Sequence, residues 1–455
     1  MSEIRDPIYG FIEPSEPELK IINTTIFQRL RKIKQLALTN LVYPTANHTR
    51  FDHSLGVLYV AKMIADKLMP GSENDEKRRI IRFAALLHDI GHGPFSHISE
   101  YLLKKYSSKV AVDKIEKIHE NITSHLIETN KELKDILSST DRKQIIGLLN
   151  GTSVELSLMK EIVTGPLDAD KQDYLLRDSY FCGVKYGVFD LYRLINTLHK
   201  YPDNGDEHLC IKHDGVNALE QFVLAKYYMI KQVYYHKVRL VSDAMLIRAV
   251  ELGIDEDNIG FLRNLYDYKN TPDYFNHYLG WWDDKFFAEF LTKKHKGYAQ
   301  NIFKRLFERK LFKGIYSVDL KQLKRHIKAP LRRRILDIDT PENRKLKKKI
   351  ELMIAKALKI EPKEYVIANS ITIKSVREMS RDSEGAVAVE KKNGKISNFE
   401  QESTIFQSID ESLKDVYFEI YAPVEYKDQR DKSKKLEYYR KEIQDILKRI
   451  KEDKK

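Results

Sequence analysis

The sequence predicts a mainly α-helical protein with a smaller C-terminal α+β lobe. Apolar residues recur at helical spacing through most of the first 260 residues, as in helices that bury one face. Runs of β-forming residues follow after residue 360, and Asn393-Gly394 inside one of them favours a tight hairpin turn. We expect one domain over residues 1–300 and a second over 301–455, which combines a basic linker region, the lobe and a charged terminal helix.

The N-terminal half contains the clearest helices. Residues 52–68 place apolar side chains at helical spacing, and residues 76–90 are apolar on nearly all sides, so the second helix should be buried. Gly91 and Gly93 should end it, and Pro94 is well placed to begin another helix. Further helices are expected at 116–134, 154–163, 169–181, 189–200, 215–252, 258–266, 282–293 and 298–311.

The α+β lobe is predicted over residues 360–425. Three runs there alternate or cluster residues that favour strands. They are Y-V-I-A-N-S-I-T-I (365–373), A-V-A-V-E-K-K-N-G-K-I (386–396) and V-Y-F-E-I-Y-A (416–422).

The composition favours a globular protein of a reducing compartment. Of 455 residues, 42% are hydrophobic and 32% charged, which is ordinary for a chain with a real core. Cys182 and Cys210 cannot form a disulfide framework, so we expect a cytoplasmic location. The N-terminus is charged where a signal peptide is apolar, and no apolar stretch approaches the roughly 20 residues that span a bilayer, so no membrane partner is expected.

The positive charge is concentrated in one segment. Residues 301–350 hold 17 lysines and arginines against 5 aspartates and glutamates, which accounts for the net charge of +12 of the whole chain. Such a block can serve nucleic acid, bound nucleotides or an acidic partner chain, or it can simply be a solvated face. Single-stranded nucleic acid is therefore one candidate partner.

Four side chains form a candidate metal site. His53 lies in R-F-D-H-S-L-G-V, His88-Asp89 in L-L-H-D-I-G-H-G-P-F-S-H, and Asp170 in L-D-A-D-K-Q-D-Y-L-L-R-D. Imidazole and carboxylate donors suit iron, manganese, zinc or magnesium and leave coordination positions open for water, as catalytic sites require. A lone histidine on a buried helix is more often a hydrogen-bonded core residue, but a His-Asp pair at the end of that helix needs a charged partner.

These strings, in the order H, H-D and D, resemble the HD-domain deoxynucleoside triphosphate (dNTP) triphosphohydrolases. The similarity begins at D-P-I-Y-G-F-I-E (6–13) and continues through F-Q-R-L-R-K-I-K-Q-L (27–36). It reaches Y-Y-H-K-V (234–238) and persists more weakly to about residue 425. The resemblance to the catalytic part of these enzymes implies an HD-domain helical core over residues 1–300.

The resemblance also implies hydrolysis of dNTPs to a deoxynucleoside and tripolyphosphate. The catalytic metal would be held by His53, His88, Asp89 and Asp170, and magnesium would sit on the triphosphate. Catalytic positions of the family are matched by His92, His97, Glu100 and His119. Substrate-binding positions are matched by Gln35, Leu36, Arg50, Lys171, Tyr174, Asp178, Lys226 and Tyr234.

The matching positions carry expected roles. His97 and Glu100 are three residues apart on the helix after Pro94, so Glu100 could orient His97 as the general acid for the leaving 5′ oxygen. The family more often has Asp at position 100. Arg50, Lys171, Tyr174 and Lys226 would bind phosphates, although the family usually has Arg at position 226. Gln35 and Asp178 would bind the sugar 3′-hydroxyl, while Leu36 and Tyr234 would leave no room for a 2′-hydroxyl.

The residue pattern alone leaves simpler interpretations open for two of these positions. Periodicity favours Tyr234 as a core aromatic, and His119 could equally be an ordinary surface residue. Their assignment to the site therefore rests on the resemblance.

The resemblance further implies assembly into a homo-oligomer, either a dimer or a tetramer. In relatives, nucleotides bound between subunits assemble an active tetramer, and six positions match their contacts: Arg31, Arg193, Asn217, His236, Lys237 and Arg309. Asn23, Asp214 and Ile230 differ from the family pattern, so activation by GTP is not expected, whereas some effect of a bound nucleotide is.

Two other functions stay open. HD sites also cut phosphodiesters, so the chain could be a nuclease or phosphodiesterase whose basic block follows a nucleic-acid backbone. It could also be a non-catalytic, nucleotide-gated binding protein, although the presence of all four ligand residues argues against this.

Overall fold

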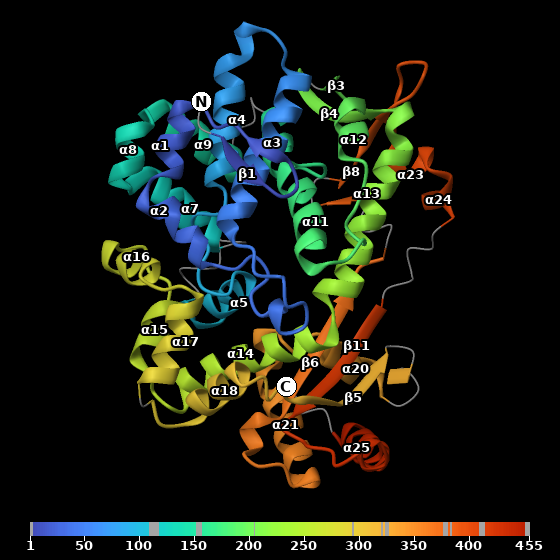
Figure 1. Ribbon diagram of the computed structural model, residues 1–455. Coiled ribbons are helices and arrows are strands. Elements are labelled where there is room, and N and C mark those ends of the chain that lie inside the picture. The colour runs from blue at the N-terminus through green and yellow to red at the C-terminus, as the bar shows by residue number, and fades with distance from the viewer. Residues whose placement is uncertain are drawn as a thin grey trace. The chain divides into compact units, whose positions relative to one another are not determined.

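A computed structural model shows two compact units that are each mainly helical (Figure 1). The prediction of a mainly α fold with smaller sheets is confirmed. The first unit comprises Met1–Tyr234, Arg263–Phe286 and Val376–Glu411, and the second Tyr235–Leu262, Phe287–Ser375 and Ser412–Lys455. The structure describes residues 3–108, 118–151, 157–203, 205–293, 295–319, 322–323, 327–375, 381–382, 385–408 and 415–450.

The boundary expected between residues 300 and 301 lies inside the second unit. Because each unit is assembled from three chain segments, one cut in the sequence does not separate them. The division into a catalytic core and a C-terminal lobe stays a prediction about function.

Three helices form the centre of the first unit. α3 (Arg50–Leu68) packs against α4 (Asp75–Leu87) and α11 (Ala169–Cys182). A capping box between Thr49 and Asp52 begins α3, and Gly183 ends α11 in the left-handed conformation, with φ of 68°. The second half of α4 is almost wholly buried, as the apolar sequence predicted.

The remaining helices of the first unit surround this centre. Residues 116, 117 and 154–156, at the starts of two predicted helices, lie outside the described residues. The helices are α1 (Glu16–Ile22), α2 (Thr25–Gln28), α5 (His97–Tyr106), α7 (Ile118–Thr129), α8 (Lys131–Ile136), α9 (Ser139–Leu149), α10 (Ser157–Thr164), α12 (Leu191–Thr197), α13 (Val216–Met229), α16 (Pro272–Leu279), α23 (Phe399–Glu402) and α24 (Thr404–Gln407).

The helix predicted over 189–200 is too long, and a sheet begins where it should end. α12 stops at Thr197, and β3 (Leu198–Asp203) and β4 (Asp206–Lys212) form a hairpin. β9 (Ala388–Glu390) pairs in parallel with β4 and antiparallel with β10 (Ile396–Asn398). The hairpin turn expected at Asn393-Gly394 is present, with Gly394 at φ of 77°, but its strands belong to this sheet rather than to the predicted lobe.

The single helix predicted over 215–252 is also wrong. After α13 the backbone makes a π-helical turn, Ile230–Tyr234, and the chain restarts as α14 (Lys237–Asp255). His236 is the N-cap of α14, and its Nδ1 accepts a hydrogen bond from the backbone N–H of Val238 at 3.2 Å. The apolar spacing continues across this break, which is why periodicity alone missed it.

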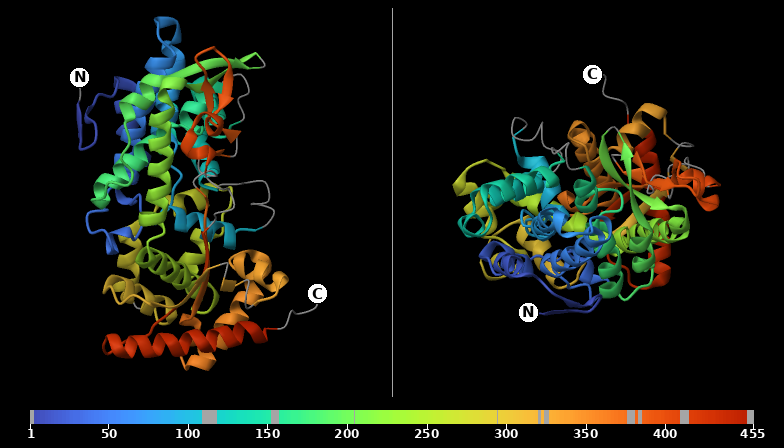
Figure 2. Two further views of the ribbon diagram at one scale, coloured as in Figure 1. Left: turned by 90° about the vertical axis from the view of Figure 1, so that its right-hand side faces the viewer. Right: turned by 90° about the horizontal axis from the view of Figure 1, so that it is seen from above.

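An antiparallel three-stranded sheet forms the second unit together with α14, α20 (Ala329–Leu336), α21 (Arg344–Leu358) and α25 (Gln429–Arg449). The strand order is β5 (Lys313–Asp319), β11 (Asp415–Ala422) and β6 (Ile367–Ile373). β6 and β11 were predicted, whereas β5 falls in the segment expected to be a linker. Figure 2 shows the predicted charged terminal helix as the long red α25.

Three further α-helices and two short hairpins complete the α-helices and strands of the described residues. β1 and β2 form an N-terminal hairpin whose register pairs Asp6 with Gly10. These elements are α15 (Gly260–Tyr266), α17 (Asp283–Thr292), α18 (Tyr298–Phe307), β1 (Ile4–Asp6), β2 (Gly10–Ile12), β7 (Arg381–Asp382) and β8 (Gly385–Ala386). Among the described residues, no helix combines the length and the apolar character that crossing a bilayer demands.

Candidate metal centre and active site

The structure brings the four predicted metal ligands together in the first unit. His53 comes from α3, His88 and Asp89 from the end of α4, and Asp170 from the first turn of α11. One donor atom from each of His53, His88 and Asp89 lies within 4.8 Å of the others. The Asp170 Oδ1 atom lies 2.9 Å from Nε2 of His53 and 3.9 Å from Nε2 of His88.

The hydrogen bonds behind the two imidazoles suit metal ligands. His53 donates from Nδ1 to Asp173 at 2.8 Å, and His88 donates from Nδ1 to the carbonyl oxygen of Ala85 at 2.8 Å. Both rings therefore direct Nε2 towards the carboxylates of Asp89 and Asp170. The His88 Nε2 atom is buried and has no hydrogen-bond partner among the described residues. A divalent cation would satisfy this donor set of two nitrogens and two carboxylates.

The electrostatics of the cluster favour a positive charge at its centre. Burial opposes protonation of His53, but hydrogen bonds to Asp170 and Asp173 outweigh it and raise its pKa to about 10. Burial also works against ionisation of Asp89, yet the positive charge of Arg50 and the hydrogen bond with His92 hold its pKa well below the ordinary range. The pKa of Asp170 is likewise lowered, because its hydrogen bond to His53 outweighs desolvation. Both carboxylates are therefore anionic near neutral pH.

Three further histidines lie beside the ligand cluster. His92 is buried, with Nε2 3.3 Å from Asp89 Oδ1, and its ring stacks on His119 at a centroid distance of 4.1 Å. The His97 ring lies edge-on to His92, with centroids 5.8 Å apart. Burial and the charges of Arg50 and His119 hold the pKa of His92 well below its usual value, so His92 is neutral at physiological pH.

The pairing expected between His97 and Glu100 is replaced by a pairing between His119 and Glu100. The Glu100 carboxylate accepts hydrogen bonds from His119 Nδ1 at 2.9 Å and from the backbone N–H groups of Ile118 and His119. It therefore holds the start of α7 against α5. His97 begins α5 after Phe95 and Ser96, which have left-handed φ values of 62° and 54°, and its side chain is exposed.

Arg50 links the ligand cluster to the predicted phosphate-binding wall. Its Nη1 atom bonds Asp89, its Nε atom donates to Ser96 Oγ at 2.9 Å, and its buried Nη2 atom has no partner among the described residues. The Gln35 Oε1 atom is also buried without one, and Leu36 is buried. Lys171 donates from Nζ to the carbonyl oxygen of Gly165 at 2.9 Å. Arg50 and Gln35 thus offer free donor and acceptor atoms to a ligand.

The family models decide how this site should be interpreted. The model of the HD domain matches residues 50–173, which contain all four candidate ligands. The model of the HD associated region matches residues 189–441, more than half of the chain. The chain belongs to the HD-domain family.

Curated relatives of this HD-domain protein include named and uncharacterised proteins. An uncharacterised protein of Methanocaldococcus jannaschii is 39% identical over 260 residues, which cover 57% of this chain and 51% of the relative. The deoxynucleoside triphosphate triphosphohydrolase SAMHD1 of Gallus gallus is 32% identical over 279 residues, covering 55% of this chain and 45% of the relative. The chain thus spans about half the length of these relatives.

Two solved structures resemble the HD-domain protein over nearly its full length. A hypothetical protein from Aquifex aeolicus is 29% identical, with a TM-score of 0.70, and the match covers 97% of this chain and 99% of that one. A phosphohydrolase from Bacteroides thetaiotaomicron is 26% identical, with a TM-score of 0.71, over 92% of this chain and 99% of that one.

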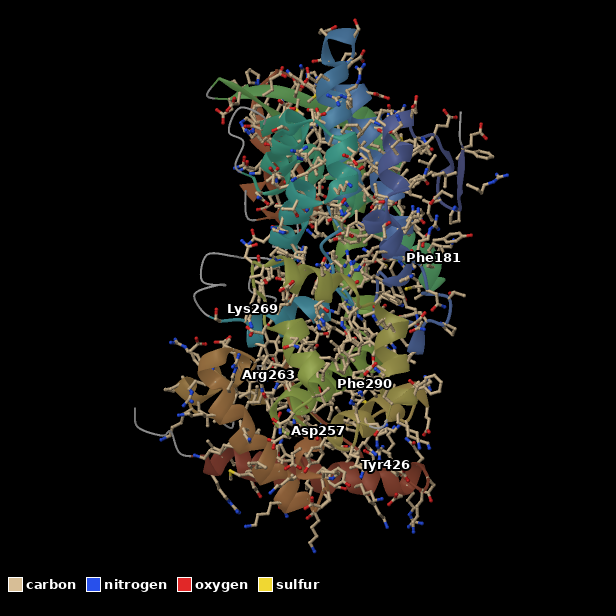
Figure 3. The ribbon with its side chains drawn as sticks, turned by 90° about the vertical axis from the view of Figure 1, so that its left-hand side faces the viewer. Phe181, Asp257, Arg263, Lys269, Phe290 and Tyr426 are labelled. Atoms are coloured by element: carbon tan, nitrogen blue, oxygen red, sulfur yellow. The ribbon has the colours of Figure 1, made fainter. Side chains whose placement is uncertain are left out.

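Sequence reasoning missed His48, which lies beside two predicted substrate residues of the HD-domain protein. His48 donates from Nε2 to Asp178 Oδ1 at 2.8 Å, and Tyr234 donates from its hydroxyl to Asp178 Oδ2 at 2.5 Å. The His48 ring stacks on Phe181, labelled in Figure 3, with centroids 4.6 Å apart. Tyr174 lies edge-on to Tyr234 at 6.4 Å. The only sequence feature that could have indicated a role for His48 is its position five residues before the candidate ligand His53.

Sequence reasoning also missed the roles of Asp173 and Arg177. Both residues lie on α11, the helix that carries the candidate ligand Asp170, and both are completely buried. Both Arg177 Nε and Nη2 bond the Asp173 carboxylate, which also accepts hydrogen bonds from His53 and from the Tyr9 hydroxyl. Arg177 therefore holds the Asp173 carboxylate in place, and Asp173 in turn bonds the candidate ligand His53.

The positions matched to nucleotide regulation divide between the two units. Arg31, Arg193 and Asn217 belong to the first unit, and His236, Lys237 and Arg309 to the second. Arg31 lies over the Phe51 ring at 3.5 Å, and Arg193 donates to the carbonyl oxygen of Asp214 at 2.9 Å. Arg309 has a left-handed φ of 53°. A regulatory role for these six residues remains a prediction.

Proposed function

We propose that this HD-domain protein is a metal-dependent phosphohydrolase that cleaves dNTPs into a deoxynucleoside and tripolyphosphate. The observation that carries the proposal is the convergence of His53, His88, Asp89 and Asp170 from three helices of one unit. The similarity to relatives named as dNTP triphosphohydrolases supports the choice of substrate.

The donor set fits iron, manganese, zinc or magnesium. When bound, such an ion would lower the pKa of water and polarise a phosphoryl oxygen. The chain's own residues would orient the substrate around it. The unpartnered Arg50 Nη2 atom is placed to donate to a phosphate, and Lys171, Tyr174 and Lys226 would complete that wall, with magnesium on the triphosphate.

A proton must reach the departing 5′ oxygen of the deoxynucleoside. His92 is unsuited to supply it, because its lowered pKa leaves it neutral. Glu100 accepts a hydrogen bond from Nδ1 of His119 at 2.9 Å and so fixes the orientation of that ring. His97 and His119 are therefore the two candidate proton donors, and separate His97→Ala and His119→Ala variants would identify which one controls turnover.

Selection of deoxyribose is proposed for the wall beside Asp178. The hydrogen bond of Tyr234 to Asp178 holds the tyrosine ring in place, and Leu36 is buried in the same unit. With Gln35 and Asp178 bonding the 3′-hydroxyl, the fixed ring would exclude a 2′-hydroxyl by packing. Such a site discriminates by shape as well as by hydrogen bonding.

Product analysis tests the proposal. Purified protein supplied with manganese or magnesium should release tripolyphosphate and deoxynucleoside from dNTPs, detected by ion-exchange chromatography or phosphorus NMR. Asp170→Ala should abolish the reaction, while Asp66→Ala should not, because Asp66 pairs with Lys62 on the exposed face of α3. Activity on nucleoside monophosphates with every dNTP untouched would reject the proposal.

Nucleic-acid cleavage is a second candidate because basic side chains gather in the second unit. Lys328, Arg333, Arg344, Lys345 and Lys348 are exposed on or beside α20 and α21. Degradation of single-stranded DNA or RNA by the wild type, abolished by Asp170→Ala, would favour this function.

Sedimentation with and without nucleotides would test the proposed homo-oligomer and its proposed regulation.

A further inference from the structure

The N-terminal hairpin contains a carboxylate whose orientation is fixed. Asp6 ends β1, and its Oδ1 atom accepts hydrogen bonds from the backbone N–H groups of Ile8 at 2.8 Å and Tyr9 at 3.0 Å. This turn is typical of aspartate. It leaves the Oδ2 atom free to accept a bond from Arg177 Nη1 at 2.8 Å.

Arg177 bridges the hairpin to α11. Its guanidinium is fully buried and bonds Asp6 on one side and both oxygens of Asp173 on the other, at 2.9 and 3.0 Å. A bidentate pair of this kind fixes the plane of the carboxylate as well as its position. Two buried carboxylates share one guanidinium, so the loss of Arg177 would leave both Asp6 and Asp173 without their shared counter-ion.

Asp173, whose position Arg177 fixes, bonds in turn to the proposed metal ligand His53. Its Oδ2 atom accepts from His53 Nδ1 at 2.8 Å, and its Oδ1 atom accepts from the Tyr9 hydroxyl at 2.8 Å. The opposite nitrogen of His53 faces Asp170. A continuous set of buried hydrogen bonds thus connects Asp6 to His53, although neither Asp6 nor Tyr9 is itself a ligand.

We propose that Asp6 and Tyr9 are positioning residues of the metal site, which act through Arg177 and Asp173 to fix the ring of His53. A carboxylate behind a ligating histidine sets the orientation of the ring and increases its basicity. The hairpin therefore contributes to metal affinity from outside the site. The inference rests on the metal site of the proposed function, and it does not depend on which substrate is cleaved.

Metal binding by the full-length chain tests the inference. Cobalt(II) is titrated into metal-free wild-type, Asp6→Asn and Tyr9→Phe protein, and its visible absorption reports both affinity and ligand geometry. Asp6→Asn should weaken the affinity about tenfold and alter the spectrum. Tyr9→Phe should cause a smaller loss in the same direction, because its ring still stacks on Tyr59, with centroids 4.5 Å apart.

Glu18→Gln is the matched control. Glu18 is buried in the same unit and bonds Arg82 at 2.6 Å, but no hydrogen bond among the described residues connects it to His53. This variant should lower the melting temperature while keeping wild-type cobalt affinity. If Asp6→Asn fails to fold, Tyr9→Phe decides the question.

Failure of the positioning role and failure of the metal site itself would give different results in this experiment. Wild-type affinity and spectrum in the folded Asp6→Asn or Tyr9→Phe protein would overturn the positioning role and leave the metal site intact. A wild-type protein that binds no cobalt, manganese, zinc or iron would remove the metal site itself.

Discussion

Gly56 of α3 lies directly against the carboxylate of Asp173 on α11, and a Cβ atom at position 56 would overlap both that carboxylate and the Arg177 guanidinium. The absence of a side chain lets the two helices approach while a buried ion pair passes between them. Gly56 lies three residues after His53 on α3. The close contact at Gly56 therefore also helps to fix the position of His53 relative to α11. The same contact between Gly56 and Asp173 therefore determines both how closely α3 packs on α11 and how the candidate metal ligands are arranged.

Gly56→Ala should consequently destabilise the protein and disturb the site. We expect the free energy of unfolding to fall by about 3 kcal/mol, the upper range for a methyl group forced into a packed interior. Urea denaturation monitored by circular dichroism measures it. Gly260→Ala is the control, because nothing lies within 4 Å of a Cβ added there, and it should change stability by less than about 0.5 kcal/mol.

His48 should influence recognition of the sugar 3′-hydroxyl through Asp178. In His48→Phe a ring can still stack on Phe181, but the hydrogen bond to Asp178 is lost. We expect kcat/KM for dATP to fall about tenfold, as the loss of one bond to a charged group implies. For dideoxy-ATP, which lacks the 3′-hydroxyl, little should change. His48→Gln retains a donor and should recover part of the activity, whereas an equal loss for both nucleotides would contradict this role.

The sequence predicted the convergence of the four candidate ligands better than their surroundings. His53, His88, Asp89 and Asp170 stand in strings that resemble one family, and the amphipathic patterns of the helices that carry them are local, so both were recognisable. The partner of Glu100 was misjudged and the partners of Arg177 were not predicted, because helical spacing only tells which side chains share a face. Which neighbouring helix meets that face depends on tertiary packing, and here α7 and the N-terminal hairpin provide the partners.

The pairing of the strands was also beyond what the local sequence could predict. The strand signal near Asn393-Gly394 was correct, but β9 pairs with β4, which lies some 180 residues earlier in the chain. Strand propensity is measured within a short window and contains no information about a distant partner. The hairpin of β3 and β4 was hidden in a different way, because apolar residues at helical spacing ran up to Leu198 and concealed the change of structure.

A buried ion pair in the second unit provides a test of stability away from the site. Arg248 bonds Glu351 at 2.7 Å and the carbonyl oxygen of Glu364 at 2.6 Å. Arg248→Met leaves the Glu351 charge buried without a counter-ion, so we expect a loss of about 3–5 kcal/mol in the free energy of unfolding. Denaturant titration measures it, and Arg333→Met, on the exposed face of α20, should stay within about 0.5 kcal/mol of wild type. Equal effects would contradict the structural role of Arg248.

Asp141 should make the stability of the first unit depend on pH. Burial alone would raise its pKa, but hydrogen bonds from Arg79 and Ser138 outweigh it, so the pKa of the folded protein lies below the ordinary value near 4. A carboxyl with a depressed pKa stabilises the fold above its unfolded-state pKa, and this contribution disappears as pH falls through the folded-state pKa.

Asp141→Asn should therefore unfold more easily than wild type at pH 7, by about 1 kcal/mol, since it loses an ion pair with Arg79 and a capping carboxylate of α9. The difference should shrink as the pH falls below about 4 and disappear once the carboxyl of the folded wild type is also protonated. Urea denaturation at pH 3, 5 and 7 provides the measurement. Asp135→Asn, an exposed position on α8, should show no such trend. A gap between wild type and Asp141→Asn that stays constant from pH 7 to pH 3 would show that packing, rather than charge, makes Asp141 important.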